Sequence, residues 1–271
     1  MLRSLWTAAS GMTAQQTNVD TIANNLANVN TTGYKSETAE FKSLLYQNLQ
    51  SKTTSANGDQ KPVSAQVGLG VRNSSITSHY TQGAFLTSDS NTAYAITGSG
   101  FFGIQGTDGN TYYTRNGDFV LGRTEDGLML CTTEGNAVLG TDGNPITFDA
   151  DYDTTQITVD EYGNFYYPDD TNNPVATGQQ IGLFQFSNPS GLEKTTSSLL
   201  RETDASGAAT NEGNGETVTR SRIKSGALEA SNVNVATEMV NLITAQRAYE
   251  LNSKAIQASD DMLSQANNLK R

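Results

Sequence analysis

The residues best suited to chemistry are a short series of aspartates in the middle of the chain. Asp149, Asp151 and Asp153 stand at alternate positions, and Asp160 follows at the twelfth place of the same stretch. Calcium-binding EF-hand loops space their carboxylates in this way, but they need a glycine at the sixth place and a glutamate at the twelfth. The sixth place here is Thr154. Alternation instead predicts a solvated strand face, so we expect no metal site and no cofactor.

Residues for other kinds of catalysis are also missing from the sequence. His79 is the only histidine, which excludes a two-histidine metal site within one chain. No GxSxG elbow or P-loop occurs. The stretch GSGFFG (98–103) has glycines at GxGxxG spacing, but it is expected to be a glycine turn that enters a buried strand. Cys131 is the only cysteine, so an internal disulfide is impossible and a small buried side chain is expected. We therefore expect no enzyme, although the aromatic residues of 162–167 keep open the alternative of a β-rich carbohydrate-binding or peptidoglycan-lytic protein.

Charge limits the partners that the chain can have. The 271 residues carry a formal net charge of -11, which argues against nucleic acid as a partner. The charges cancel within residues 1–30 and again within 231–271, so the excess lies in the middle and does not oppose packing of the two ends. No stretch approaches the roughly 20 apolar residues of a membrane span, and the N-terminus lacks the pattern of a secretory signal. We expect no membrane insertion, and export, if it occurs, without cleavage.

Hydrophobic periodicity predicts a helix at each end of the chain. The first has apolar residues three and four apart, a heptad pattern interrupted by Gln16, and Gly33 is expected to stop it. Asn234 is expected to cap the second helix, and Glu238 to favour its first turn. Both stripes are compatible with core helices of one domain, and also with pairing of the two ends and contacts between subunits.

The region between the helices predicts short β-strands. Gly-containing turns such as 108–110, 116–118, 134–136 and 142–144 separate β-like runs at 111–114, 137–139, 157–159 and 164–167. The expected fold class is α+β, with the terminal helices paired as a coiled coil around an all-β middle domain. The expected boundaries are paired helices in 1–33 and 231–271, an extended polar linker over 34–66, a β domain over 67–222 with a mobile loop at 203–219, and a return linker over 223–230.

Several long motifs resemble flagellar rod and hook proteins. They are LWTAASGM (5–12), ANNLANVNTTGYK (23–35), QVGLGV (66–71), TQGAF (81–85), GSGFFGI (98–104), YTRNGDFVL (113–121) and the stretch that begins LEASNVNVATEM at residue 228. The resemblance covers nearly the whole chain. Chain length and the polar stretch after the first helix resemble the distal-rod branch, with a proximal rod or short hook-type subunit as the alternative.

The resemblance implies a structural subunit that polymerises helically into a hollow shaft and transmits torque to the hook. It implies, as partners, further copies of the chain, proximal rod and hook proteins, envelope bushing rings and the flagellar type III export apparatus. Asparagine amides near the helix ends are expected to set the register between subunits, because an amide donates and accepts without charge. The expected assembly interface comprises Leu5, Ala9, Met12, Val19, Ala23, Asn24, Asn25, Leu26, Asn28, Asn232, Asn234, Val235, Met239, Leu242, Gln246, Tyr249, Ile256 and Leu263.

Overall fold

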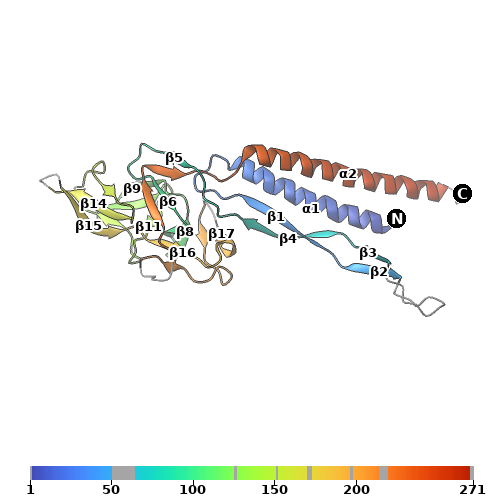
Figure 1. Ribbon diagram of the computed structural model, residues 1–271, viewed down its shortest axis with the longest axis horizontal. Coiled ribbons are helices and arrows are strands. Elements are labelled where there is room, and N and C mark those ends of the chain that lie inside the picture. Colours follow the sequence, from blue (N-terminus) through green and yellow to red (C-terminus); the bar gives the residue numbers. More distant parts are fainter. Residues whose placement is uncertain are drawn as a thin grey trace. The chain divides into compact units, whose positions relative to one another are not determined.

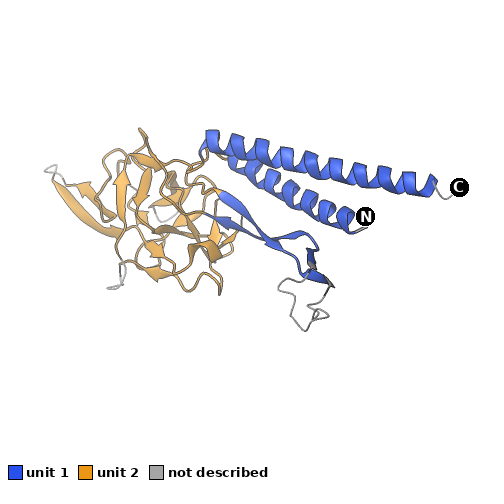
Figure 2. Ribbon diagram, turned by 45° about the vertical axis from the view of Figure 1, so that its right-hand side comes forward, with its two compact units in different colours: residues 1–27, 37–78, 234–271 blue, residues 28–36, 79–233 orange. Residues whose placement is uncertain are grey.

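The chain forms two compact units that differ in secondary structure. The computed structural model describes residues 2–50, 65–124, 127–150, 152–169, 173–195, 198–213 and 219–268. Unit 1 contains residues 1–27, 37–78 and 234–271, and unit 2 contains residues 28–36 and 79–233 (Figure 2). The order of elements is an N-terminal helix, a β-rich middle and a C-terminal helix, so the predicted α+β class is confirmed.

Two long helices form the main part of unit 1. The helices α1 Leu2–Ala27 and α2 Val235–Asn268 lie side by side and run in opposite directions (Figure 1). The Asn234 side chain accepts a hydrogen bond from the Thr237 N–H at 3.2 Å, and Glu238 lies in the first turn, so the predicted start of α2 is confirmed. Among the described residues, no helix is long and apolar enough to cross a membrane.

A β-ribbon beside α1 completes unit 1. Strand β1 Glu37–Ser43 pairs with β4 Val71–Ser78, and β2 Tyr46–Gln50 pairs with β3 Ala65–Gly68, both antiparallel. The Val71 N–H donates to Ser10 Oγ of α1 at 3.3 Å. Within the predicted extended polar linker 34–66, residues 37–43 and 46–50 are therefore strands of a ribbon, because ladder hydrogen bonds can hold a solvated ribbon with few apolar residues. Residues 51–64 lie outside the described part of the chain.

The strands of unit 2 are short and, where paired, antiparallel. Within the described residues, the largest sheet contains β7 Phe101–Gln105, β8 Thr111–Thr114, β9 Phe119–Thr124, β10 Gly127–Thr132, β11 Ala137–Val138, β12 Thr147–Phe148, β16 Leu183–Gln185, β17 Glu193–Lys194, β18 Leu200–Arg201 and β19 Thr210–Asn211. Smaller sheets join β13 Thr158–Val159, β14 Asn164–Pro168 and β15 Pro174–Gln180, then β6 Tyr94–Thr97 with β20 Arg222–Ser225, and β5 Phe85–Thr87 with β21 Ala227–Glu229. A 3-10 turn, η1 Pro189–Gly191, precedes β17.

Aromatic side chains fill the core of unit 2. Phe102 packs edge-on against Phe119, with ring centroids 5.1 Å apart, and Phe148 packs in the same way against Phe165 at 4.9 Å. Cys131 is buried, as predicted for a small apolar side chain. The strand predictions for 111–114 and 164–167 are confirmed by β8 and β14. Burial of these rings, at about 150–250 Å² each, is the main favourable contribution to folding of this unit.

Two predicted loops of unit 2 are strands or packed segments instead. In the predicted mobile loop 203–219, β19 pairs with β16, and Ser206 and Glu212 are buried. Residues 214–218 of that prediction lie outside the described part. The predicted return linker 223–230 contains most of β20 and all of β21. The loop prediction relied on polar composition, and buried hydrogen bonds compensate that polarity here.

The aspartates that resembled a calcium loop hold turns instead. The backbone N–H groups of Tyr162 and Asn164 both donate to Asp160 Oδ1 at 2.9 Å, closing the turn between β13 and β14. The backbone N–H and hydroxyl of Thr155 bond to Asp153 and hold the pKa of its carboxyl below the usual range. Asp151 lies outside the described residues. These are Asx-type turns, in which a carboxylate replaces a backbone acceptor.

Candidate assembly interface

The N-terminal part of α1 turns small and polar side chains toward α2. Ser4 Oγ lies 3.3 Å from Ser259 Oγ, and a Cβ added at Gly11 would come within 2.9 Å of the Asn252 side chain. Ala8 and Ala245 are buried in the same unit. Small residues allow helix backbones to approach closely, but they bury little apolar surface. The pairing of α1 with α2 therefore leaves larger apolar side chains for other contacts.

The predicted heptad row lies one residue away from the row that faces α2. Ser4, Ala8 and Gly11 have the spacing of a heptad seam, and so do Leu5, Ala9 and Met12. One residue on a helix corresponds to a rotation of about 100°, so the two rows lie on adjacent faces. Large apolar residues of α2 also lie away from α1: Val240 is 62 % exposed, and Leu251 is 66 % exposed.

Exposure separates the predicted interface residues into three groups. The exposed group is Ala9, Ala23, Asn24, Asn234, Val235, Met239, Gln246 and Tyr249. The half-buried group is Leu5, Met12, Val19, Leu26, Asn28, Asn232, Leu242, Ile256 and Leu263. The third group is Asn25 alone, which is buried. Within a single chain, all but one of the predicted interface residues therefore keep some surface in contact with solvent.

The asparagines near the helix ends do different things. Asn25 is 1 % exposed, and its side chain both donates to Glu37 O at 2.8 Å and accepts from the Glu37 N–H at 2.9 Å. The interpretation that Asn25 faces a neighbouring subunit is therefore wrong, because its amide already bonds to both backbone groups of Glu37 at the start of β1. Asn28 accepts from the Thr31 hydroxyl at 3.1 Å. Asn24 is exposed, and its amide donates to Glu37 Oε2 at 3.5 Å.

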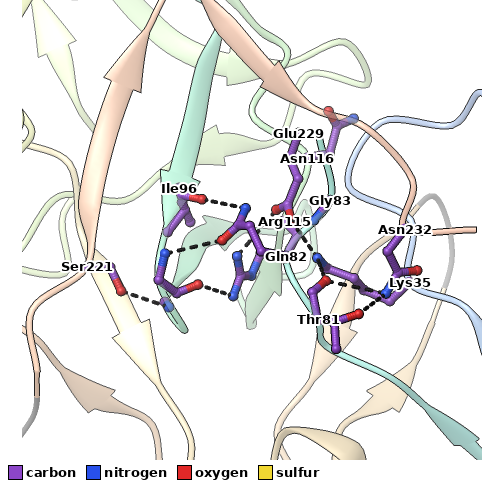
Figure 3. A network of polar contacts seen from close by, with 12 residues as sticks. Lys35, Thr81, Gln82, Gly83, Ile96, Arg115, Asn116, Ser221, Glu229 and Asn232 are labelled. Atoms are coloured by element: carbon purple, nitrogen blue, oxygen red, sulfur yellow. Dashed lines mark hydrogen bonds and ion pairs between the residues drawn. The ribbon is translucent and has the colours of Figure 1, made fainter. Parts of the chain in front are cut away.

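A buried ionic cluster in unit 2 was not predicted. Lys35 Nζ lies 2.5 Å from Glu229 Oε1, and Arg115 Nη1 lies 3.3 Å from Glu229 Oε2 (Figure 3). The Gly83 N–H donates to Glu229 Oε1 at 2.9 Å. The three charged side chains are at most 3 % exposed. Two buried cations thus depend on one carboxylate.

Burial dominates the electrostatics of this cluster. It lowers the pKa of both Lys35 and Arg115, against the opposing attraction of Glu229. Further bonds offset part of that cost: Lys35 donates to Thr81 O at 2.8 Å, and Arg115 donates to Gly98 O at 2.7 Å. A buried ion pair of this kind contributes little net stability when it is intact, but removing one partner is strongly destabilising.

The cluster joins the segment that follows α1 to the segment that precedes α2. The Gly33 N–H donates to Glu229 O at 2.8 Å, and the Ser36 N–H donates to Asn232 Oδ1 at 2.7 Å. The Asn232 amide also donates to His79 O at 2.8 Å (Figure 3 shows Asn232 beside Lys35). Asn232 therefore has an internal role in unit 2, in addition to its predicted place in the interface.

The residues of the cluster lie in motifs that are visible in the sequence, but the sequence does not show which of these residues contact one another. Lys35 ends TGYK, Gly83 lies in TQGAF, Arg115 lies in YTRNGDFVL, and Glu229 lies in LEASN. These are four of the motifs on which the resemblance to rod and hook proteins rests. All four motifs therefore contribute a group to the surroundings of one carboxylate.

Models of flagellar rod and hook families match the chain in three places. The model described as flagella basal body rod protein matches residues 5–35, and the model of the flagellar hook protein FlgE/F/G D1 domain matches residues 95–167. The model described as flagellar basal body rod FlgEFG protein C-terminal matches residues 224–269. The first and last matches cover most of both helices, and the second covers strands of unit 2. The class of protein is thus a flagellar rod or hook protein.

Full-length relatives narrow this class. The flagellar basal-body rod protein FlgG of Borreliella burgdorferi is 45 % identical over 278 residues, with 100 % of each chain covered. Proteins of the same name are 40 % identical in Caulobacter vibrioides, with 99 % and 100 % covered, and 37 % identical in Bacillus subtilis, with 100 % of each covered. The chain belongs to the flagellar basal-body rod protein family, and it is a structural, non-enzymatic rod subunit of the basal body. The alternative of a lytic enzyme is wrong.

Proposed function

We propose that the chain forms the distal rod by helical polymerisation, with α1 and α2 of many copies packed as a coiled-coil layer. The carrying observation is that the α1–α2 face uses small residues such as Ser4 and Gly11, while Val240 and Leu251 remain exposed. Fully burying a side chain of this size contributes about 1.5–3 kcal/mol. A heterologous contact that does not close generates an open helical filament, the form that a drive shaft requires.

The same proposal includes the neighbours of the rod. Further copies of the chain are the main partner, and proximal rod and hook proteins adjoin the two ends of the polymer. Envelope rings surround it, and the flagellar type III export apparatus delivers the subunits without cleavage. Support for the distal position comes from the full-length similarity to proteins named FlgG, together with the length of the chain. A proximal rod or short hook-type subunit is the alternative that the assembly experiment below distinguishes.

Glutamate substitutions on the exposed face of α2 test polymerisation. In cells whose own gene is deleted, Val240→Glu and Leu251→Glu should abolish motility and rod completion, because a carboxylate would be buried without a partner in the polymer. The purified variants should unfold like the wild type, because both positions are exposed in a single chain. Gln265→Glu is the matched control at an exposed polar position of the same helix. Normal motility of both glutamate variants would contradict the proposal.

Electron microscopy of basal bodies from the same strains tests the position of the chain. Antibody labelling or a tag should mark the part of the rod adjacent to the hook. Labelling confined to the end nearest the inner membrane would favour the proximal alternative, and labelling beyond the rod would favour a hook-type subunit.

A further inference from the structure

A groove lies between α1, α2 and β1 inside unit 1. Its volume is ≈ 470 Å³, and its lining combines Ile22 of α1, Ala245 of α2 and Phe41 of β1. The carboxylates of Glu37 and Glu238 belong to the same lining. Amide and hydroxyl side chains, including Asn18 and Thr244, complete the lining. The groove thus combines an apolar patch with polar groups and two acids, which fits a ligand that has an apolar body, a hydrogen-bond donor and a positive charge.

The opposite end of α1 carries groups with this chemistry. Trp6 is the only tryptophan of the chain, and it is 76 % exposed. Arg3 precedes it by three residues, so both side chains lie on one face of the helix. Arg3 is exposed and supplies the only positive charge in α1. An exposed indole beside an arginine is typical of the anchors that protein interfaces bury.

We propose that the Arg3–Trp6 edge of one copy docks in this groove of the next copy. This inference rests on the proposed polymer and identifies one of its contacts. The Trp6 ring packs on Ile22 and Ala245, and the Arg3 guanidinium faces the acids of the rim. The indole N–H needs an acceptor when it is buried. Asn18 and Asn241, which also line the groove, provide amide oxygens for it.

The Arg3–Trp6 edge and the groove lie at different places along α1, which predicts an open chain of subunits. Trp6 lies near the start of α1, and the groove lies along residues 15–22 of the same helix. A contact between two different surfaces is heterologous, so each copy both inserts a tryptophan and receives one. With about 1.5 Å of rise per residue, the contact offsets neighbouring copies by roughly 18 Å along the helix.

Disulfide crosslinking in assembled rods tests the contact. In one chain, the Ser4–Ser259 and Gly11–Asn252 pairs place Trp6 level with Gln257. Ala248 in the groove is nine residues from that level, which is about 14 Å along α2. A disulfide requires Cα atoms within about 7 Å, so a bridge between positions 6 and 248 must join two copies. The double variant Trp6→Cys/Ala248→Cys should therefore give a ladder of crosslinked multimers on oxidation of isolated basal bodies.

The neighbouring position provides a matched control. Arg247 is one residue away on α2 but is exposed and outside the groove lining. Trp6→Cys/Arg247→Cys should give at least about tenfold less crosslinking, because its thiol is directed to another face. Cys131 is buried, so Trp6→Cys alone is the background control. Equal crosslinking at 247 and 248, or rods without any crosslink, would overturn the contact while leaving the chain established as a rod subunit.

A second probe covers the case in which Trp6→Cys does not enter rods. Replacement of Trp6 by p-benzoyl-phenylalanine keeps a large aromatic ring and forms a covalent bond on illumination. The adduct should run as a dimer and map to residues 37–41 or 238–248. An adduct confined to residues 255–263 would be the contact expected within one chain, and it would refute docking in the groove. Absence of both variants from rods that otherwise complete would refute the proposed function instead.

Discussion

Replacement of Glu229 by glutamine removes the single carboxylate that two buried cations share. The variant keeps the size of the side chain and keeps an oxygen for the Gly83 N–H, so it changes the charge and creates no cavity. At an effective dielectric constant of about 20, the contacts of 2.5 and 3.3 Å correspond to attractions of roughly 7 and 5 kcal/mol. Desolvation outweighs the attraction of Glu229 in the wild type, as the lowered pKa values of Lys35 and Arg115 indicate.

We expect Glu229→Gln to lower the free energy of unfolding of unit 2 by about 3–5 kcal/mol, because the two cations remain buried without a partner. The measurement is equilibrium urea unfolding, followed by near-UV circular dichroism of the core tyrosines. Glu193→Gln is the matched control, because the Glu193–Arg201 pair is exposed and its loss should change little. A loss no larger than that of the control would refute the view that Glu229 compensates two buried charges.

The pH dependence of the same variant gives an independent check. Lys35 has a folded-state pKa below its unfolded value of 10.5, so between the two values the unfolded chain binds more protons and stability rises with pH. Loss of Glu229 removes an interaction that raises the pKa of Lys35, which widens this window toward lower pH. The difference in the free energy of unfolding between the wild type and Glu229→Gln should therefore shrink as the pH approaches 10.5. A deficit that is constant with pH would indicate that Lys35 keeps its proton and that the loss has another cause.

Three further substitutions test particular contacts. Gly33→Ala should destabilise unit 2 by more than about 1 kcal/mol in thermal unfolding, because φ is +71° and the new Cβ would lie 2.6 Å from a backbone nitrogen; Gly109→Ala, with φ +79° and open space, should cost less. Tyr94→Phe should stabilise by about 1 kcal/mol, since its hydroxyl is buried without a hydrogen-bond partner among the described residues. Burial raises the pKa of Tyr94 above 10, so wild-type stability falls above pH 10 as the unfolded chain loses this proton, and the variant should show a smaller fall. Asn25→Ala should destabilise the monomer by about 1–3 kcal/mol in urea unfolding. Asn24→Ala removes only a long, exposed hydrogen bond to Glu37, so it should weaken rod assembly and cost the monomer less than Asn25→Ala; equal effects of the two on the monomer would contradict their different burial.

Features set by neighbouring residues could be predicted from the sequence. The terminal helices follow from contacts between residues three and four apart, and the cap at Asn234 follows from its place before the first turn. Strands such as β8 and β14 follow from alternation between glycine turns. The ribbon strands β1 and β2 were missed, because exposed strands alternate little and polar composition alone also fits a linker.

Features that join distant parts of the chain depended on the tertiary structure. The sequence contains two heptad rows one residue apart in α1, and the position of α2 decides that Ser4 and Gly11 face it while the Leu5 row lies on the adjacent face. In the same way, the motifs that contain Lys35, Arg115 and Glu229 were visible, but their pairing was not. Periodicity is a property of a local segment, whereas the pairing of charges up to 194 residues apart exists only after the chain has closed around them.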